Sequence, residues 1–366
     1  MRATAELHEL GQSIWLDNIT RELLDSGQLQ AYIDDYSVTG LTSNPSIFDK
    51  AIGSGYYDDA IRAKASAGTS TEDLFFGLAI EDLRRAADLF LPIHERTGRV
   101  DGWVSLEVSP LLAYDTEKTV QAAKELHDQA ARQNLLIKIP GTKEGLPAIE
   151  ESIAAGVPIN VTLLFSADQY RAAADAFMRG IERRIAAQQD PAVMSVASVF
   201  MSRWDVAVQD RVPEPLKDRL ALAVGLGVYR AYREVMDSER WQRLENSGAR
   251  MQRLLWASTS TKDPKAPDDL YLRSLGAPFT INTVPDGTLR AFYDHGHVPK
   301  PMPMDGGDAE TTLVEFTSAG VDLDALAAKL QSDGAESFVG AWKDLLAHIE
   351  KQTAALGAPT ATEQRR

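Results

Sequence analysis

Cysteine is absent from this chain of 366 residues, and other signals of particular protein classes are missing too. Without cysteine the protein has no disulfide framework, no thiolate metal site and no cysteine nucleophile. The longest apolar stretch, residues 220–228, is far too short to span a bilayer. Residues 1–12 lack the apolar segment of a signal peptide. These absences predict a cytoplasmic protein.

Positive charge is also scarce, because 38 lysines and arginines stand against 53 acidic residues and give a formal net charge of -15. This surplus argues against a nucleic-acid partner and against binding to an anionic membrane surface. A phosphorylated substrate would need local positive contacts. His295 and His297 flank a glycine, but no third ligand stands at a matching spacing. We therefore expect neither a metal ion nor another cofactor.

The chain does contain a regular alternation of short apolar runs and amphipathic helical patterns. Helical spacing of apolar residues is seen, for example, in residues 116–133 and 167–188. A succession of such units, without a doubly wound switch, predicts an α/β fold of the (β/α)8 barrel type. The expected strands are residues 13–18, 38–44, 102–109, 135–140, 158–165, 194–201, 253–258 and 279–284.

Two long connections and a C-terminal extension enlarge the predicted barrel. Residues 45–101 follow the second strand and contain helical patterns at about 57–67 and 71–96. Residues 204–252 follow the sixth strand and contain another helical stretch. A final amphipathic helix is expected at about 323–349. The sequence thus predicts additional helices after strands 2 and 6 and at the C-terminus.

The domain organisation follows from these inserts. A length of 366 residues fits two domains, but it also fits one barrel with insertions. Prolines in residues 297–308 forbid a helix there, so that segment is expected to be a loop. We predict one barrel domain over residues 1–356 and a disordered tail at 357–366.

Lys138 stands inside the fourth apolar run, whose sequence is LLIKIP. Strand alternation places it on one face with Leu136 and Pro140. Burying an ammonium is unfavourable, because desolvation disfavours the charged form. A lysine held there can lose its proton near neutral pH and become the nucleophilic amine that Schiff-base chemistry requires. The alternative is a lysine whose ammonium reaches solvent or pairs with a carboxylate.

Other polar residues end the neighbouring strands, where barrel enzymes hold their active sites. One such residue would fit a satisfied polar group of the core, but five consecutive strands favour a shared site. The acidic members are suited to proton transfer, the threonine to holding a water beside Glu107, and the amides to binding sugar hydroxyls. These residues are Asp17, Asn44, Glu107, Asn160 and Thr162, around Lys138.

A hydroxyl and a cation follow each of the next two strands. Ser198 and Arg203 come at the end of the sixth strand, and Ser258 and Lys262 at the end of the seventh. Such pairs are suited to clamping a phosphate group. The alternative for Lys262 is an ordinary capping loop before the next turn.

Two segments resemble signatures of the transaldolase family. Residues 40–48, GLTSNPSIF, resemble its first signature, and residues 135–148, LLIKIPGTKEGLPA, resemble the second, which surrounds a Schiff-base lysine. The resemblance extends over residues 15–283, and the long inserts are similar to the longer bacterial subgroup. Leu41 departs from the smaller or β-branched residue usual in the first signature. Many members have an arginine soon after the serine that corresponds to Ser258, and in this chain Ser260 or Lys262 stands nearby.

The resemblance implies a class I aldol mechanism in the pentose phosphate pathway. A dihydroxyacetone unit would move from sedoheptulose 7-phosphate to glyceraldehyde 3-phosphate, giving erythrose 4-phosphate and fructose 6-phosphate. Lys138 would form the imine and Asp17 would be the acid/base at the C4 hydroxyl. The remaining roles implied are a water held by Glu107 and Thr162, dihydroxyacetone bound by Asn44 and Asn160, and phosphate bound by Ser198 and Arg203.

Other functions stay open at this point. An aldolase of the same mechanism would release free dihydroxyacetone, and it is distinguished by cleavage without an acceptor aldehyde. A catalytically silent barrel that binds sugar phosphates or a protein partner would leave Lys138 unreactive. A metal-dependent barrel hydrolase would be inhibited by a chelator. The sequence is compatible with a monomer or a homodimer.

Overall fold

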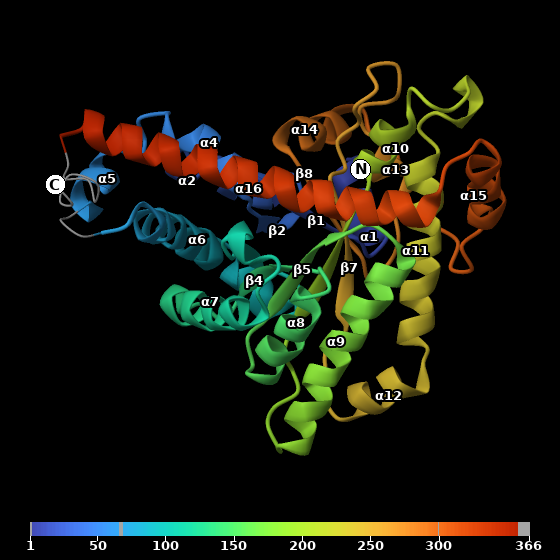
Figure 1. Cartoon of the computed structure of the whole chain (residues 1–366), viewed down its shortest axis with the longest axis horizontal. Coiled ribbons are helices and arrows are strands. Elements are labelled where there is room, and N and C mark those ends of the chain that lie inside the picture. The colour runs from blue at the N-terminus through green and yellow to red at the C-terminus, as the bar shows by residue number, and fades with distance from the viewer. Residues whose placement is uncertain (1, 66–68, 299, 358–366) are drawn as a thin grey trace.

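The computed structural model describes residues 2–65, 69–298 and 300–357. Within these ranges eight parallel strands close into a barrel in chain order, with β1 beside β8 (Figure 1). Each predicted run matches one strand, so the (β/α)8 prediction is confirmed. Residues 358–366, which include most of the predicted disordered tail, lie outside the described residues. The strands are β1 Ser13–Asp17, β2 Val38–Thr42, β3 Val104–Glu107, β4 Leu135–Pro140, β5 Ile159–Leu164, β6 Ser195–Phe200, β7 Gln252–Ala257 and β8 Ile281–Val284.

Helices surround the barrel and fill the long connections. Three follow β2 and three lie between β6 and β7, so the predicted additional helices are confirmed, although the last residues of the helix expected at 57–67 lie outside the described residues. The helices are α1 Ala3–Glu9, α2 Arg21–Asp25, α3 Gln28–Asp35, α4 Pro45–Ile52, α5 Asp58–Lys64, α6 Thr71–Arg96, α7 Thr116–Ala130, α8 Gly145–Ala154, α9 Ala167–Ala186, α10 Ser202–Val208, α11 Leu220–Met236, α12 Glu239–Asn246, α13 Leu270–Ser274, α14 Asp286–His295, α15 Ala309–Ser318 and α16 Leu323–Ala355.

Side-chain caps fix where several of these helices begin. The hydroxyl of Ser70 accepts from the third backbone N–H of α6, and Asp115 and Ser166 do the same for α7 and α9. Each cap satisfies a backbone donor that has no partner within the helix. The apolar faces of these helices then pack on the barrel. No helix in the described part of the chain has the length and apolar character needed to cross a membrane.

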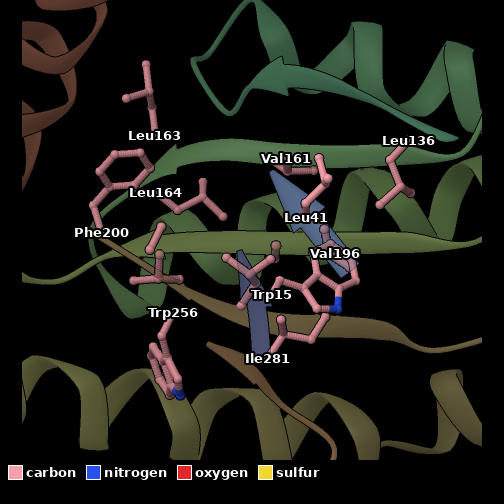
Figure 2. Close-up of a cluster of buried hydrophobic side chains, with 14 of the residues drawn as sticks. Trp15, Leu41, Leu136, Val161, Leu163, Leu164, Val196, Phe200, Trp256 and Ile281 are labelled. Atoms are coloured by element: carbon pink, nitrogen blue, oxygen red, sulfur yellow. The ribbon is translucent and has the colours of Figure 1, made fainter. Parts of the chain in front are cut away.

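Trp15 is fully buried and fills the barrel interior near the N-terminal ends of the strands (Figure 2). Its indole N–H donates to the Asp101 carboxylate at 2.8 Å. Gly40 is its neighbour on β2, and a Cβ at that glycine would lie 2.7 Å from the indole and 2.7 Å from the Trp103 carbonyl oxygen. The glycine therefore makes room for the tryptophan at the base of the barrel.

The last helix, α16, runs across the molecule as one long element (Figure 1). Its Gln331 donates through Nε2 to the carbonyl oxygens of Gly141 at 3.1 Å and Leu163 at 2.9 Å, beside the ends of β4 and β5. A Cβ at Gly334 would lie 2.9 Å from the Leu163 side chain. These contacts place α16 over the C-terminal ends of the strands, where it covers part of the barrel mouth.

Replacing Gly40 by alanine should destabilise the fold by about 2 to 4 kcal/mol, because neither the indole nor the carbonyl can yield easily. The midpoint of urea unfolding measures the effect. Gly227→Ala is the matched control, since a Cβ there meets no atom within 4 Å and the residue lies within α11. The free energy of unfolding of that variant should rise by about 0.5 to 1 kcal/mol. Equal midpoints for the two variants would contradict this account of the barrel base.

Candidate active site

A cavity of about 330 Å³ opens at the C-terminal end of the barrel. It lies at the mouth crossed by α16, and side chains of that helix form part of its wall. Eight of the ten site residues expected from the sequence line it, namely Asp17, Asn44, Lys138, Thr162, Ser198, Arg203, Ser258 and Lys262. The other two, Glu107 and Asn160, are buried in the wall beside Lys138.

Lys138 is only 5% exposed, so its amine does not reach bulk solvent. Its Nζ lies 3.3 Å from Glu107 Oε2 and donates to the Ser43 carbonyl oxygen, also at 3.3 Å. The parallel register pairs Lys138 with Glu107 on β3 and with Asn160 on β5, so the three side chains point into the barrel together. The ring of Phe338 lies 5.6 Å from Nζ on the side of α16.

Asp17 ends β1 and lines the same cavity as Lys138. Thr42 donates to its Oδ1 at 2.9 Å, and the same hydroxyl lies 2.7 Å from that of Thr283. Burial raises the pKa of Asp17, although the nearby Lys138 and the hydrogen bond from Thr42 oppose the rise. A carboxylate with a raised pKa is a better proton acceptor than an ordinary aspartate.

Glu107 shares this electrostatic environment. Burial raises its pKa, and the neighbouring Lys138 opposes the effect. Glu107 Oε2 forms an ion pair with Lys138, whereas Glu107 Oε1 and the fully buried Thr162 hydroxyl have no hydrogen-bond partner among the described residues. Unpartnered buried polar atoms are unfavourable for stability and are concentrated at functional sites.

The two predicted amides have structural partners that sequence reasoning did not identify. Asn44 Oδ1 accepts from the Ile47 backbone N–H at 3.2 Å, so the side chain caps α4 while also lining the cavity. Asn160 donates through Nδ2 to the Ser105 hydroxyl at 3.1 Å and accepts from Ser198 at 2.7 Å. Asn160 therefore orients the Ser198 hydroxyl from within the wall.

The cationic side of the cavity is formed after β6 and β7. The Arg203 guanidinium lies 5.2 Å from the centroid of the Phe200 ring and 6.0 Å from that of the Phe338 ring, and the two rings also contact each other. Burial lowers the pKa of Arg203, although Asp333 opposes the effect. Such an arginine remains charged at neutral pH and is suited to binding an anion.

The loop after β7 brings a second cation to this side. Ser258 has a left-handed backbone, with φ of 56°, and its hydroxyl lies 2.9 Å from that of Ser202. This bend turns the chain away from the barrel axis. Lys262 is exposed at the rim and donates to the Ser260 hydroxyl at 2.6 Å.

Several lining residues were not found from the sequence. Lys50 reaches the cavity from α4, the helix that Asn44 caps. Its position on that helix is a local signal that could have suggested it. Ser337 and Phe338 come from α16, far along the chain. No local pattern connects α16 with the strand ends, so only the packing of that helix reveals these two residues.

The comparisons with known proteins agree with this geometry. The model of the Transaldolase/Fructose-6-phosphate aldolase family matches residues 14–349. The chain belongs to this family. Similar relatives include Transaldolase 2 of Nostoc punctiforme, which is 39% identical over 94% of this chain and 96% of its own length. The transaldolases of Parafrankia and Acidothermus cellulolyticus are 43% and 44% identical over 95% of this chain, and over 97% and 96% of their own lengths.

Thr162→Val should change the free energy of unfolding by less than about 0.5 kcal/mol, because the Thr162 hydroxyl makes no hydrogen bond to another described residue that the substitution would remove. The matched control is Thr259→Val, since the Thr259 hydroxyl is equally buried but donates to the Thr283 carbonyl oxygen at 2.8 Å. The free energy of unfolding of that variant should fall by about 1 kcal/mol. Urea unfolding midpoints compare the two. A Thr162→Val protein as unstable as the control would show that its hydroxyl has a stabilising partner.

Proposed function

We propose that the chain is a transaldolase that works through a Schiff base on Lys138. The observation that carries the proposal is the buried amine 3.3 Å from Glu107, in one cavity with Asp17. Relatives covering almost the whole chain have the name transaldolase. The reaction moves a dihydroxyacetone unit from sedoheptulose 7-phosphate to glyceraldehyde 3-phosphate. The products are erythrose 4-phosphate and fructose 6-phosphate.

The first half of the reaction forms the imine. Lys138 must be neutral to attack the ketose C2, and the Glu107 carboxylate is close enough to take its proton. The raised pKa of Glu107 favours this transfer. A water held between Glu107 and the Thr162 hydroxyl relays protons to the carbinolamine oxygen. That oxygen leaves as water, and the protonated imine remains on Lys138.

Carbon–carbon cleavage follows from the imine. Asp17 takes the proton of the C4 hydroxyl, the C3–C4 bond breaks, and its electron pair moves to the imine nitrogen. The aldose leaves while the three-carbon enamine stays bound to Lys138. The acceptor aldehyde then enters, Asp17 returns the proton to the new hydroxyl, and hydrolysis of the imine releases the product ketose. The imine nitrogen is the electron sink, so this sequence contains no step for a metal ion.

The remaining cavity residues bind the substrate in this proposal. The amides of Asn44 and Asn160 bind the dihydroxyacetone hydroxyls, and Asn160 also accepts from the Ser198 hydroxyl. Arg203, Ser198 and Ser258 bind the phosphate group. The positive charge that many family members obtain from an arginine after the seventh strand is supplied by other lining residues, which are Lys50 and Lys262.

Three features of this enzyme stay predictions from the sequence. One catalytic domain is expected over residues 1–356. The protein is expected to be a monomer or a homodimer in the cytoplasm. Sugar phosphates are its expected partners, with neither nucleic acid nor membrane involved.

Incubation with fructose 6-phosphate and borohydride should leave a reduced three-carbon adduct on Lys138, found by mass spectrometry of the digested protein. Lys138→Ala should lose the adduct and at least about 10³-fold in kcat, because Lys138 is the lining amine that lies beside the Glu107 carboxylate. Circular dichroism checks that the variant is folded. Wild-type turnover in this variant, or an adduct on another lysine, would contradict the assignment.

Dependence on an acceptor separates the proposal from its rivals. With fructose 6-phosphate alone, a transaldolase should form the adduct but release little dihydroxyacetone, and erythrose 4-phosphate should restore turnover. Steady release of dihydroxyacetone without an acceptor would indicate the aldolase. A folded wild-type protein without adduct would indicate a barrel that only binds sugar phosphates.

Thr42→Val should move the acidic limb of the kcat/KM profile to higher pH. The hydrogen bond from Thr42 lowers the pKa of Asp17, so its loss raises that pKa further. Asp17 must be ionised to accept the hydroxyl proton, and activity is therefore lost at a higher pH as the solution is acidified. Thr39→Val is the control, since this hydroxyl of the same strand bonds to Ile14 instead. Superimposable profiles for wild type and Thr42→Val would refute the role of Asp17.

A further inference from the structure

A second polar cavity, of about 180 Å³, lies at the opposite end of the barrel from the candidate active site. Trp103, Pro158, Met194 and Arg250 line it, and each stands one or two residues before the start of a strand. The cavity is therefore at the N-terminal face, which the proposed transaldolase reaction does not use.

Three arginines converge on this cavity from separate parts of the chain. Arg99 comes from the loop after α6, Arg184 from α9, and Arg250 from the loop before β7. None has a carboxylate oxygen within 4.0 Å among the described residues. Two other arginines of α9, Arg179 and Arg183, instead pair with acidic residues of α8. Three grouped arginines without acidic partners, in a chain with a net charge of -15, favour a site for an anionic ligand.

Two of the guanidinium groups are held in place by backbone carbonyls. Arg184 donates through Nε to Asp190 O at 2.7 Å and through Nη1 to Ala154 O at 3.0 Å. Arg250 donates through Nη1 to Gly98 O at 2.6 Å, and its buried Nε has no partner. Each guanidinium keeps further N–H groups for a ligand. Guanidinium groups that are already held in position bind the oxygens of a phosphate with little loss of side-chain entropy.

One carboxylate also lines the cavity and must be weighed against the arginines. Asp190 is exposed, and its Oδ1 accepts from the Ala192 backbone N–H at 2.9 Å. Three arginines and one aspartate leave the lining with a formal charge of +2. The aspartate reduces the positive potential but does not neutralise it.

His94 adds a different kind of group to the wall. It is 1% exposed and packs edge-on against Trp103, with ring centroids 4.7 Å apart. Its Nδ1 lies 3.1 Å from the Asp101 carbonyl oxygen, which can only accept, so Nδ1 carries a proton. Nε2 of the neutral ring is then an acceptor, and it has no partner among the described residues. Burial lowers the pKa of His94, and the nearby cations Arg99 and Arg250 add to this effect, while the hydrogen bond to the Asp101 carbonyl and the nearby Glu95 oppose it.

We propose that this cavity binds a phosphate group, either free or on a small ester, at a site separate from the catalytic one. Arg99, Arg184 and Arg250 hold the anionic oxygens. A protonated phosphate oxygen or a neighbouring ligand hydroxyl donates to His94 Nε2. The volume is below the range of about 300 to 1,000 Å³ typical of pockets for drug-sized ligands, so the occupant is small.

Calorimetric titration with inorganic phosphate tests the site, in an Arg203→Gln background that weakens anion binding in the catalytic cavity. Ionic strength is held constant with sodium chloride. One saturable site should remain, and adding Arg99→Gln should weaken it about 10-fold, because a charged hydrogen bond is lost. Arg99 suits this test since its guanidinium makes no hydrogen bond among the described residues. Arg62→Gln on α5, an equal charge change far from the cavity, should leave the affinity unchanged.

Crystals of the same background soaked in tungstate provide a second readout. A tungsten peak among the three arginines supports the site. Absence of saturable phosphate binding, equal affinity in the Arg99→Gln and Arg62→Gln proteins, or tungsten confined to the catalytic cavity would overturn it. No turnover is measured, so these results do not depend on the proposed transaldolase activity.

The identity of the occupant is resolved by two further titrations. Sulfate carries no proton at neutral pH, so it should bind several-fold more weakly than phosphate, and His94→Phe should abolish that preference. Equal binding of sulfate and phosphate to the histidine-containing protein would refute the role of His94. Glycerol 3-phosphate then compares an ester with the free ion. Tighter binding of the ester indicates a phosphorylated metabolite, and tighter binding of phosphate indicates the free ion.

Discussion

The placement of an amine among carboxylates inside a barrel is the constraint on which the catalytic end depends. Lys138, Glu107 and Asp17 are held by strands whose register is set by parallel backbone hydrogen bonds. Desolvation disfavours each charge alone, and their proximity compensates in part. The result is a group of one amine and two carboxylates at the mouth of the barrel. A shift of the register by one residue would turn the three groups to the outer face.

Polar groups are buried at both ends of the barrel interior. Near the base, Asp101 accepts from the Ser13 hydroxyl and the Trp15 indole, and Arg253 donates to Ser13 Oγ at 2.7 Å and Thr280 O at 3.0 Å. Other buried atoms of that end, among them His94 Nε2, have no hydrogen-bond partner among the described residues. At the mouth the same is true of the Thr162 hydroxyl, while Glu107 Oε2 lies 3.3 Å from Lys138 Nζ.

The additions to the barrel take part in the site. The first insert begins with the Asn44 cap and brings Lys50 to the cavity on α4. The last helix places the Phe338 ring within 5.6 Å of Lys138 Nζ and 6.0 Å of the Arg203 guanidinium, so one aromatic ring is shared by the two cations. Such a ring limits water near the amine while its face stabilises positive charge. The contacts of Phe338 therefore give a physical reason for the long C-terminal helix of this chain.

The sequence by itself determined the barrel, the strands and eight of the residues that line the cavity. Short apolar runs with polar ends are local signals, and the closure of successive β–α units brings the polar ends to one rim. The hydrogen-bond partners of Asn160 could not be predicted from a local pattern, because Ser105 and Ser198 lie on other strands. Phe338 and the arginine cavity at the barrel base were decided only by tertiary structure. Their residues are brought together by the packing of segments far apart in the chain, and periodicity within one segment carries no information about that packing.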